Sequence, residues 1–364
     1  MKIMSITTKK KKIWPKLLLV VVLILAGSGV FGYNYYQQLN EPVSSSSQEV
    51  AFTVPSGASI STVLTQLEED GLIRSAFATK IKQQLSPVAV DLKAGEFTLD
   101  TSWDAQEMLQ FMSNSQNILV DVVNLTFIDG ERATDYARVI ESKLGIPATE
   151  VLETWNDPEY LASLIDTYEV LTDDILSSDV RYALEGYLAP NTYQFFLDAD
   201  VKDVTKRLLD QSEKFYLENK TLFDNSQLSI HEVFNLSSIV QLEAKYPEDM
   251  KLVASVFHNR LALPMRLESS VTVCYALDQY TSWQECESNV GIESPYNTYR
   301  VDGLPVGPIA NPGANALLAV LDPVESNYYF FMSEMYGDTQ GTFHYAETFA
   351  EHEKNVNQYL RGNQ

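Results

Sequence analysis

Glu243 lies near the middle of the chain in the segment SSIVQLEA and is the first candidate for acid–base chemistry. Leu236, Ile239 and Val240 precede it by seven, four and three residues, a spacing that places them on its side of a helix. Apolar neighbours disfavour the charged form of a carboxyl group and raise its pKa, so such a Glu can donate a proton near neutral pH. The alternative is a helix-edge Glu paired with Lys245 or another base.

A second acidic candidate, Glu185, lies in the segment LEGYLAPNTY, which combines Gly and Pro with aromatic residues. Gly and Pro predict a bent segment. Aromatic faces beside amide groups suit sugar rings, which need an apolar platform and hydrogen-bond partners. The alternative is a structural turn packed by Tyr187 and Tyr193. The segment therefore indicates either a sugar-binding loop or a packed corner.

The stretch from Pro295 to Pro312 is dominated by Pro, Gly and aromatic residues and predicts ordered loops. Loops held on a rigid scaffold commonly carry binding groups. Asn297 lies in SPYNTY and Asn311 in GLPVGPIANPG. Each asparagine is a candidate to hydrogen-bond a ligand or to satisfy its own turn.

The N-terminus predicts a membrane anchor. Residues 17–36 begin with LLLVVVLILAGSGVFGY, carry no charge and have aromatic residues at both borders, which fits the roughly 20 residues that span a bilayer. Lysines gather before this run, which predicts a cytoplasmic tail of residues 1–16 and export of the rest. A cleaved signal peptide is the competing interpretation, but the run is long for one and no clear A-x-A site follows. We therefore expect a single-pass protein of the cell membrane with extracytoplasmic C-terminal domains.

The charge balance constrains the partners of the exported part. The chain has a net charge of −23, and its first 33 residues hold six lysines and no acidic residue, so the remainder carries −29. Nucleic-acid-binding surfaces need basic patches, so an acidic surface argues against a nucleic-acid partner.

The chain contains two cysteines, Cys274 and Cys286, with no CxxC pair or Cys/His cluster, so we expect no metal site. Export permits a disulfide between them, and two free thiols are an equal alternative.

The pattern of apolar residues predicts an α+β fold with two exported domains after a polar linker at 37–49. Residues 50–116 predict a small α+β module with the order strand, helix, helix, strand, helix, in which Ser59 or Ser61 caps the first helix. Residues 117–364 predict a mainly helical α+β domain that begins with a β-rich segment. Its helices are expected near 133–143, 148–156, 158–166, 201–218, 229–245 and 249–262.

Several sequence blocks, in this order, resemble the endolytic murein transglycosylases, the MltG-type or YceG-like family. The resemblance covers essentially the whole exported chain, because residues 51–112 also look like the LysM-like module of that family. A looser match is TFAEH at 348–352. The five main blocks are LEGYLAPNTY at 184–193, SSIVQLEA at 237–244, LVASVFHNRLALPMRLESSVTV at 252–273, SPYNTY at 294–299 and GLPVGPIANPG at 303–313.

The resemblance implies a lytic transglycosylase, a carbon–oxygen lyase acting on polysaccharides, that cuts within nascent peptidoglycan strands and terminates their elongation. It implies no cofactor. The implied partners are glycan strands, cell-wall synthases (penicillin-binding proteins) and elongation or division proteins. The family's catalytic Glu falls on Glu243. Motif positions expected to support the site or shape the glycan cleft are Glu185, Tyr193, Asn297, Tyr299 and Asn311.

A lytic transglycosylase needs one well-placed Glu, whereas hydrolytic glycosidases usually need two carboxylates. The Glu protonates the leaving glycosidic oxygen and then accepts the proton of the C6 hydroxyl that attacks C1 of the same muramyl residue. The product is a 1,6-anhydro sugar. The attack is intramolecular, so effective molarity replaces the second carboxylate.

This sequence departs from the family pattern at four positions that we single out. Gln241 stands where the family often has an acidic residue, and Ser270 stands where Gln-Ser-Asp-Pro-Thr usually has its Asp. Ala189 and Asn191 flank Pro190 where the family usually reads Phe-Pro-Asp. Any role of those family residues is therefore open in this chain, while Glu243 is intact.

Two other functions compete with the transglycosylase. A muramidase-like hydrolase would act on the same glycan and would need Glu185 or another carboxylate as its second catalytic group. A non-catalytic peptidoglycan-binding scaffold of the cell-wall synthesis machinery would fit the LysM-like module and the altered motif positions. An aminodeoxychorismate lyase, a label also given to this family, is disfavoured because the chain has no evident pyridoxal-phosphate site and an exported domain would not meet a cytoplasmic folate precursor.

Overall fold

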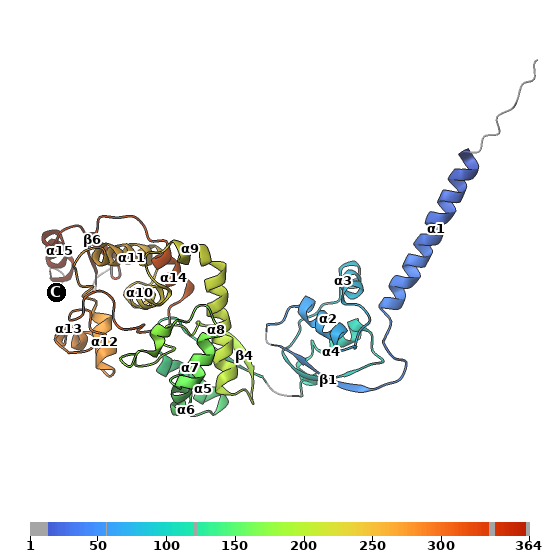
Figure 1. Ribbon diagram of the computed structural model, residues 1–364, viewed down its shortest axis with the longest axis horizontal. Helices are drawn as coiled ribbons and strands as arrows, with labels where there is room; N and C mark the ends of the chain where they lie inside the picture. The colour runs from blue at the N-terminus through green and yellow to red at the C-terminus, as the bar shows by residue number, and fades with distance from the viewer. Residues whose placement is uncertain (1–13, 56, 120–121, 335–338, 362–364) are drawn as a thin grey trace, which may run out of the picture. The chain divides into compact units, whose positions relative to one another are not determined.

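The computed structural model describes residues 14–55, 57–119, 122–334 and 339–361, with side chains described from residue 27 onward. The chain divides into two compact units, Met1–Val122 and Val123–Gln364 (Figure 1). Helices and strands occur in both units, so the expected α+β class is confirmed.

The first unit begins with a long helix, α1, which includes the segment predicted to cross the membrane. Among the helices whose side chains are described, none combines the length and apolar character that a bilayer crossing requires. The lysines at positions 2 to 12 lie outside the described residues. The membrane anchor therefore stays a prediction.

The rest of the first unit has the order strand, helix, helix, strand, helix that the pattern predicts. β1 and β2 pair antiparallel with Phe52 opposite Phe97, and both rings are buried beneath the helices. Ser59 caps α2 by accepting a hydrogen bond from Thr62 N, so the first of the two proposed caps is the one used. The bounds are α1 Trp14–Leu39, β1 Glu49–Val54, α2 Ile60–Glu69, α3 Ala76–Leu85, β2 Gly95–Asp100 and α4 Ala105–Phe111.

The second unit is mainly helical. Its described strands form two short sheets, in which β3 pairs with β4 and β5 pairs with β6. The bounds are β3 Val122–Phe127, α5 Ala133–Leu144, α6 Ala148–Thr154, α7 Pro158–Ile165, β4 Asn191–Phe196, α8 Val201–Glu218, α9 Lys220–Asn225, α10 Ile230–Glu243, α11 Pro247–Leu261, α12 Ser270–Leu277, α13 Trp283–Ser288, α14 Ala314–Leu321, β5 Phe330–Ser333, β6 Phe343–Ala346 and α15 Phe349–Asn355, followed by a π-helical turn at Val356–Arg361.

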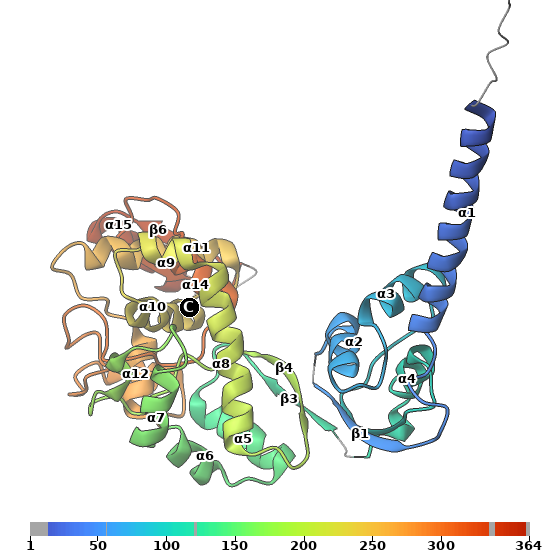
Figure 2. The ribbon, with the colours of Figure 1, turned by 45° about the vertical axis from the view of Figure 1, so that its right-hand side comes forward.

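Helix α10 forms the centre of the second unit and packs against α11, α12 and α14 (Figures 1 and 2). Its first turn is fixed by a capping box, in which Ser229 and Glu232 bond each other's backbone N–H groups. Residues 233–240 are all buried, so the helix is enclosed on every side. The helix ends at Glu243 because Ala244 is extended and Pro247 begins α11.

Candidate active site

Glu243 is the last residue of α10 and projects from the end of a buried helix into a cavity of about 370 Å³. Leu236, Ile239 and Val240 are fully buried, as the spacing predicts for its apolar side. Lys245, the partner in the alternative interpretation, lies instead over the Tyr246 ring at 5.7 Å. Glu243 is thus held by a buried helix and lines a space large enough for a small ligand.

One hydrogen bond orients the Glu243 carboxylate: the Ser269 hydroxyl donates to its Oε1. Ser269 is itself fixed, because its backbone N–H donates to the Thr298 hydroxyl at 3.0 Å and its carbonyl accepts from the Thr272 hydroxyl at 2.7 Å. Thr272 and Thr298 are fully buried and share a 2.9 Å hydroxyl contact. A buried network therefore holds the side chain that donates a hydrogen bond to the carboxylate.

The backbone immediately before Ser269 is strained. Glu268 has φ +48°, a left-handed conformation that is rare for a residue with a side chain. Its N–H donates to the Thr298 carbonyl at 3.2 Å, which holds the turn in place. Strain of this kind persists where surrounding contacts over-determine the conformation, and here it directs Ser269 towards Glu243.

Burial raises the pKa of Glu243 above its ordinary value. The Ser269 hydrogen bond and the positive charge of Arg260 act in the opposite direction, and the negative charge of Glu287 adds to the increase. Its position at a helix C-terminus also disfavours negative charge. The surroundings therefore favour a carboxyl group that holds its proton to higher pH than an ordinary Glu.

Arg260, on α11, is the cationic side chain of the cavity. Its guanidinium donates to the carbonyl oxygens of Tyr329 at 2.6 Å and of Leu267 at 2.8 Å, and it lies over the Phe330 ring at 5.1 Å. These contacts tie the segment that precedes Ser269 to strand β5. Arg260 thus supports the cavity wall and places a fixed positive charge near Glu243.

The cavity wall combines aromatic rings with a few polar groups. Its acidic lining residues besides Glu243 are Glu268 and Glu287. His352 of α15 lines it as well. Flat apolar faces with scattered polar groups suit sugar rings. The aromatic residues in the wall are Phe257, Trp283, Tyr299, Phe330, Phe331, Phe343 and Phe349.

Glu185 lies in a different place and does not line this cavity. It is 1% exposed and accepts hydrogen bonds from Ala133 N at 2.7 Å, Tyr275 Oη at 3.3 Å and Asn311 Nδ2 at 3.3 Å. Burial raises its pKa to about 8, while the hydrogen bonds from Ala133 and Tyr275 and the positive charge of Arg132 limit the increase. Glu185 therefore joins the start of α5 to α12 and to the loop that carries Asn311.

Asn311 is fully buried and holds the bend after Glu185. Its Oδ1 accepts from Gly186 N at 2.9 Å and Leu188 N at 3.2 Å. Gly186 has φ +89°, and a Cβ there would lie 2.4 Å from Pro308. The bend thus requires glycine on both conformational and steric grounds.

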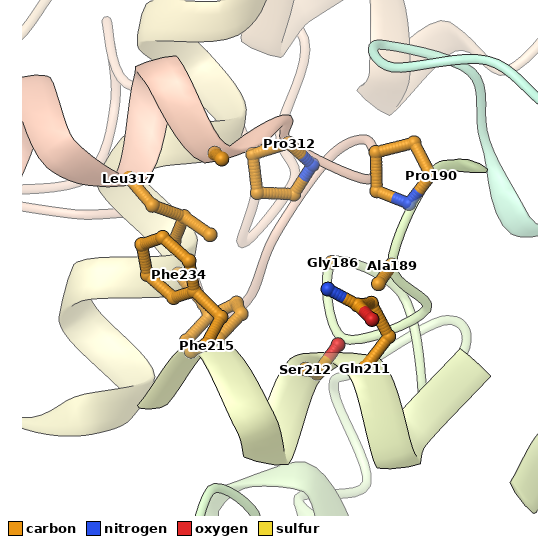
Figure 3. A pocket seen from close by; sticks show the side chains of 10 residues that line it. Gly186, Ala189, Pro190, Gln211, Ser212, Phe215, Phe234, Pro312 and Leu317 are labelled. Carbon is orange, nitrogen blue, oxygen red and sulfur yellow. The ribbon is translucent and has the colours of Figure 1, made fainter. Parts of the chain in front are cut away.

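The segment LEGYLAPNTY forms a packed corner and not an open platform. Tyr187 is fully buried and Tyr193 is 5% exposed, with its hydroxyl donating to the Ala189 carbonyl at 2.9 Å. Figure 3 shows Gly186, Ala189 and Pro190 facing side chains of α8, α10 and α14 across a small gap. That gap measures about 70 Å³, well below the roughly 300 Å³ at which ligand pockets begin.

Of Asn297 and Tyr299, only Tyr299 lines the cavity. Asn297 is fully buried, and its Nδ2 donates to the carbonyls of Val290 at 2.9 Å and Ile292 at 2.8 Å. Tyr299 lines the Glu243 cavity, and burial raises the pKa of its hydroxyl to about 12. Among the predicted residues the cavity therefore unites Glu243 with Tyr299, while it is not lined by Glu185, Tyr193, Asn297 or Asn311.

The four departures from the family pattern lie in different surroundings. Gln241 bridges two loops, donating to Asp129 Oδ2 at 3.0 Å and accepting from Gly313 N at 3.0 Å. Ser270 lines the Glu243 cavity at the start of α12. Ala189 belongs to the packed corner, and Asn191 is exposed at the start of β4.

Sequence reasoning singled out neither Arg260 nor the aromatic residues contributed by α13, β5, β6 and α15. Arg260 lies within the block at 252–273, and a buried arginine in an apolar helical pattern is the signal that was available. The phenyl rings of β5 and β6 come from short strands whose alternation is too brief to predict a face. The open choice for the cysteines is settled, because Cys274 and Cys286 form a disulfide that joins α12 to α13.

Comparison with known proteins identifies the family. The model of the YceG-like family matches residues 52–358, and the chain therefore belongs to the YceG-like family. The crystal structure of a YceG-like protein from Listeria monocytogenes is similar, with a TM-score of 0.58 and 30% sequence identity over 85% of this chain and 99% of that one.

Curated relatives carry an activity in their names. A Bacillus subtilis (strain 168) protein named endolytic murein transglycosylase is 28% identical over 343 residues, or 93% of this chain and 91% of that protein. A Streptococcus pneumoniae (strain D39) protein of the same name is 27% identical over 361 residues, or 94% of this chain. The chain spans 64% of the length of that pneumococcal relative.

Proposed function

We propose that the protein is an endolytic lytic transglycosylase that cleaves the MurNAc–GlcNAc bond within nascent peptidoglycan strands and leaves 1,6-anhydro-MurNAc ends. The observation that carries the proposal is Glu243, a carboxyl group with a raised pKa at the end of a buried helix, open to an aromatic cavity. Family membership and the names of the curated relatives support the same activity.

In the proposed reaction Glu243 acts first as acid and then as base. Its carboxyl proton passes to the glycosidic oxygen as the bond from that oxygen to C1 of the muramyl residue breaks. The C6 hydroxyl oxygen of the same residue then bonds to C1, and its proton returns to the Glu243 carboxylate. One bond breaks and one forms, no water is consumed, and Glu243 ends in its starting state.

Neighbouring groups have separable roles in this scheme. Ser269 holds the carboxyl in one orientation through its hydrogen bond to Oε1. Arg260 supplies a fixed positive charge that offsets the negative charge left on Glu243 after it has given up its proton. Tyr299 keeps its hydroxyl proton because the pKa is about 12, so it is a hydrogen-bonding group for the glycan at neutral pH.

The predicted site residues that do not line the cavity act as positioning residues in this proposal. Glu185 and Asn311 fix the bend that separates α8 from the loop at 303–313. Asn297 fixes the segment that precedes Tyr299. Tyr193 packs against that corner. Their loss is expected to act through the shape of the cavity.

The proposal also covers where the enzyme acts in the cell. Residues 17–36 are proposed to anchor it in the cell membrane with the N-terminus cytoplasmic, and residues 50–116 to be a LysM-like module that binds glycan. The substrate is the growing strand, so cell-wall synthases and elongation or division proteins are the proposed partners. The synthases make the same polymer that this enzyme is proposed to cut.

The test is to digest uncrosslinked glycan strands with the full chain and to determine product lengths and ends by mass spectrometry. The proposal expects internal cuts with 1,6-anhydro-MurNAc ends. Reducing ends would indicate a hydrolase, with Glu268 or Glu287 as the second carboxylate in the same cavity. Folded protein that binds the strands without cutting them would indicate the scaffold. Either result would overturn the proposal.

A further inference from the structure

Residues 274–293, called the arm below, lie between two of the sequence blocks that carry the family resemblance, at 252–273 and 294–299. The arm contains the end of α12, all of α13 and the turns around them. Two of its side chains, Trp283 and Glu287, line the same cavity as Glu243. A segment outside the shared blocks therefore forms part of the wall around the proposed acid.

The arm has its own small core and is fastened at both ends. Val273, Cys274 and Cys286 form a buried cluster separate from the main core of the unit, and the disulfide Cys274–Cys286 lies within it. Tyr275 fixes the start of the arm in the main core, and the disulfide links that start to Cys286 on α13. At the other end Asn297 holds the carbonyls of Val290 and Ile292.

The two cavity-lining side chains of the arm share one face of α13. Trp283 and Glu287 are four residues apart, which places them one above the other on a helix. Trp283 is 39% exposed although it is among the largest apolar side chains, and Glu287 is exposed beside it. An indole face next to a hydrogen-bond acceptor matches a sugar ring, which has an apolar face and hydroxyl or amide donors at its edge.

Two further aromatic side chains line the same cavity. Phe330 of β5 and Phe349 of α15 are ring neighbours, with centroids 5.8 Å apart, and both line the cavity. Phe349 is 59% exposed. A sugar ring that stacks on Trp283 would therefore enter a cavity whose wall has further apolar faces.

We propose that the arm is a sugar-binding subsite, in which Trp283 stacks on a pyranose ring of the glycan strand and Glu287 accepts a hydrogen bond from a hydroxyl or acetamido N–H of that ring. This inference rests on the proposed function, because it assumes that the occupant of the cavity is a glycan strand. The disulfide positions both groups with respect to Ser269, which precedes α12, and so with respect to Glu243.

The first test measures kcat and KM of the full chain on uncrosslinked glycan strands. For Trp283→Ala we expect KM to rise about tenfold while kcat changes less than about twofold, since the lost contact is made in the ground state and the transition state alike. Trp283→Phe keeps a flat ring and is expected to recover most of the loss. Glu287→Gln is expected to raise KM about threefold, a smaller effect because one hydrogen bond is weakened.

Tyr280→Ala is the matched control. Tyr280 is an aromatic residue of the same arm, 44% exposed, and it is not among the residues lining the cavity. The subsite requires Tyr280→Ala to keep the wild-type KM. An equal rise in KM for Trp283→Ala and Tyr280→Ala would overturn the inference, because it would mean that any disturbance of the arm has the same effect.

A binding measurement separates this inference from the proposed function. Glycan strands are titrated into Glu243→Gln while tryptophan fluorescence is followed, and the titration is repeated with Trp283→Phe added. The inference expects a saturable change that disappears with Trp283→Phe, whether or not the wild type cleaves the strands. An unchanged signal in the double variant overturns the subsite and leaves the transglycosylase proposal untouched.

Discussion

Two regions of the second unit each contain a glutamate whose pKa is raised by burial, and they differ in every other respect. Glu185 is 1% exposed and accepts hydrogen bonds from three groups on three different segments. Glu243 accepts a hydrogen bond from Ser269 and opens onto a cavity of about 370 Å³. The carboxyl group of Glu185 is enclosed and held by three segments of the chain, whereas that of Glu243 faces an open cavity.

The difference teaches that a raised pKa alone does not identify a catalytic acid. Both carboxyl groups hold their protons to higher pH than an ordinary Glu because both are desolvated. Of the two carboxyl groups, only that of Glu243 lines a cavity in which a reacting group fits. We therefore interpret Glu243 as the reacting carboxyl and Glu185 as a support for the bend and for α12.

The largest expected effect is on activity at Glu243. Glu243→Gln keeps the size of the side chain and removes the transferable proton, so we expect kcat to fall by about 10³-fold or more. Thermal unfolding should be close to that of the wild type. Turnover within tenfold of the wild type would remove Glu243 from the mechanism.

Glu185→Ala should be the largest effect on stability. It leaves Ala133 N and the side chains of Tyr275 and Asn311 without their acceptor, and each buried unsatisfied group costs roughly 1–3 kcal/mol. We expect the free energy of unfolding to fall by about 3 kcal/mol in denaturant titration. Glu185→Gln is the matched control, because its amide oxygen can still accept the bond from Ala133 N, and it should lose less than half as much.

Glu185 also predicts a pH dependence of stability. Its pKa is about 8 in the folded chain and near 4.5 in the unfolded chain, so the folded state binds the proton more tightly. The contribution is fully present below pH 4.5 and is lost as the pH rises through about 8, up to roughly 5 kcal/mol in all. We expect urea unfolding between pH 5 and pH 8 to show that the free energy of unfolding of the wild type falls relative to that of Glu185→Gln as the pH rises. Parallel pH profiles would contradict the assignment.

The smallest effect concerns Ser269. Its hydrogen bond lowers the pKa of Glu243, so removal of the hydroxyl raises that pKa further. We expect Ser269→Ala to lower kcat about tenfold through lost orientation and to move the alkaline limb of the pH–rate profile to higher pH. A shift to lower pH would mean that the hydroxyl does not act on Glu243.

Much of this arrangement could be predicted from the sequence, because it depends on local periodicity. The helix predicted at 229–245 is α10, Ile230–Glu243, and the helix predicted at 201–218 is α8, Val201–Glu218. The apolar side of Glu243 followed from the positions of Leu236, Ile239 and Val240. In these cases neighbours along the chain are also neighbours in space.

The rest of the site depends on contacts between distant segments. Asn297 and Asn311 were candidates to hydrogen-bond either a ligand or their own turns. Only the fold shows that both side chains bind backbone groups and do not line the cavity. Trp283 and Phe349 come from opposite ends of a long stretch of sequence and line one cavity. No periodicity within a segment carries that information, so the aromatic wall required the structure.

The most direct measurement is to digest glycan strands with the full chain in water enriched in oxygen-18 and to weigh the new ends by mass spectrometry. The account predicts 1,6-anhydro-MurNAc ends that contain no oxygen-18, because the C6 hydroxyl of the strand is the attacking group, and no such ends with Glu243→Gln. One oxygen-18 atom for each cut would mean that water attacks C1. That result would contradict the single-glutamate mechanism proposed for this cavity.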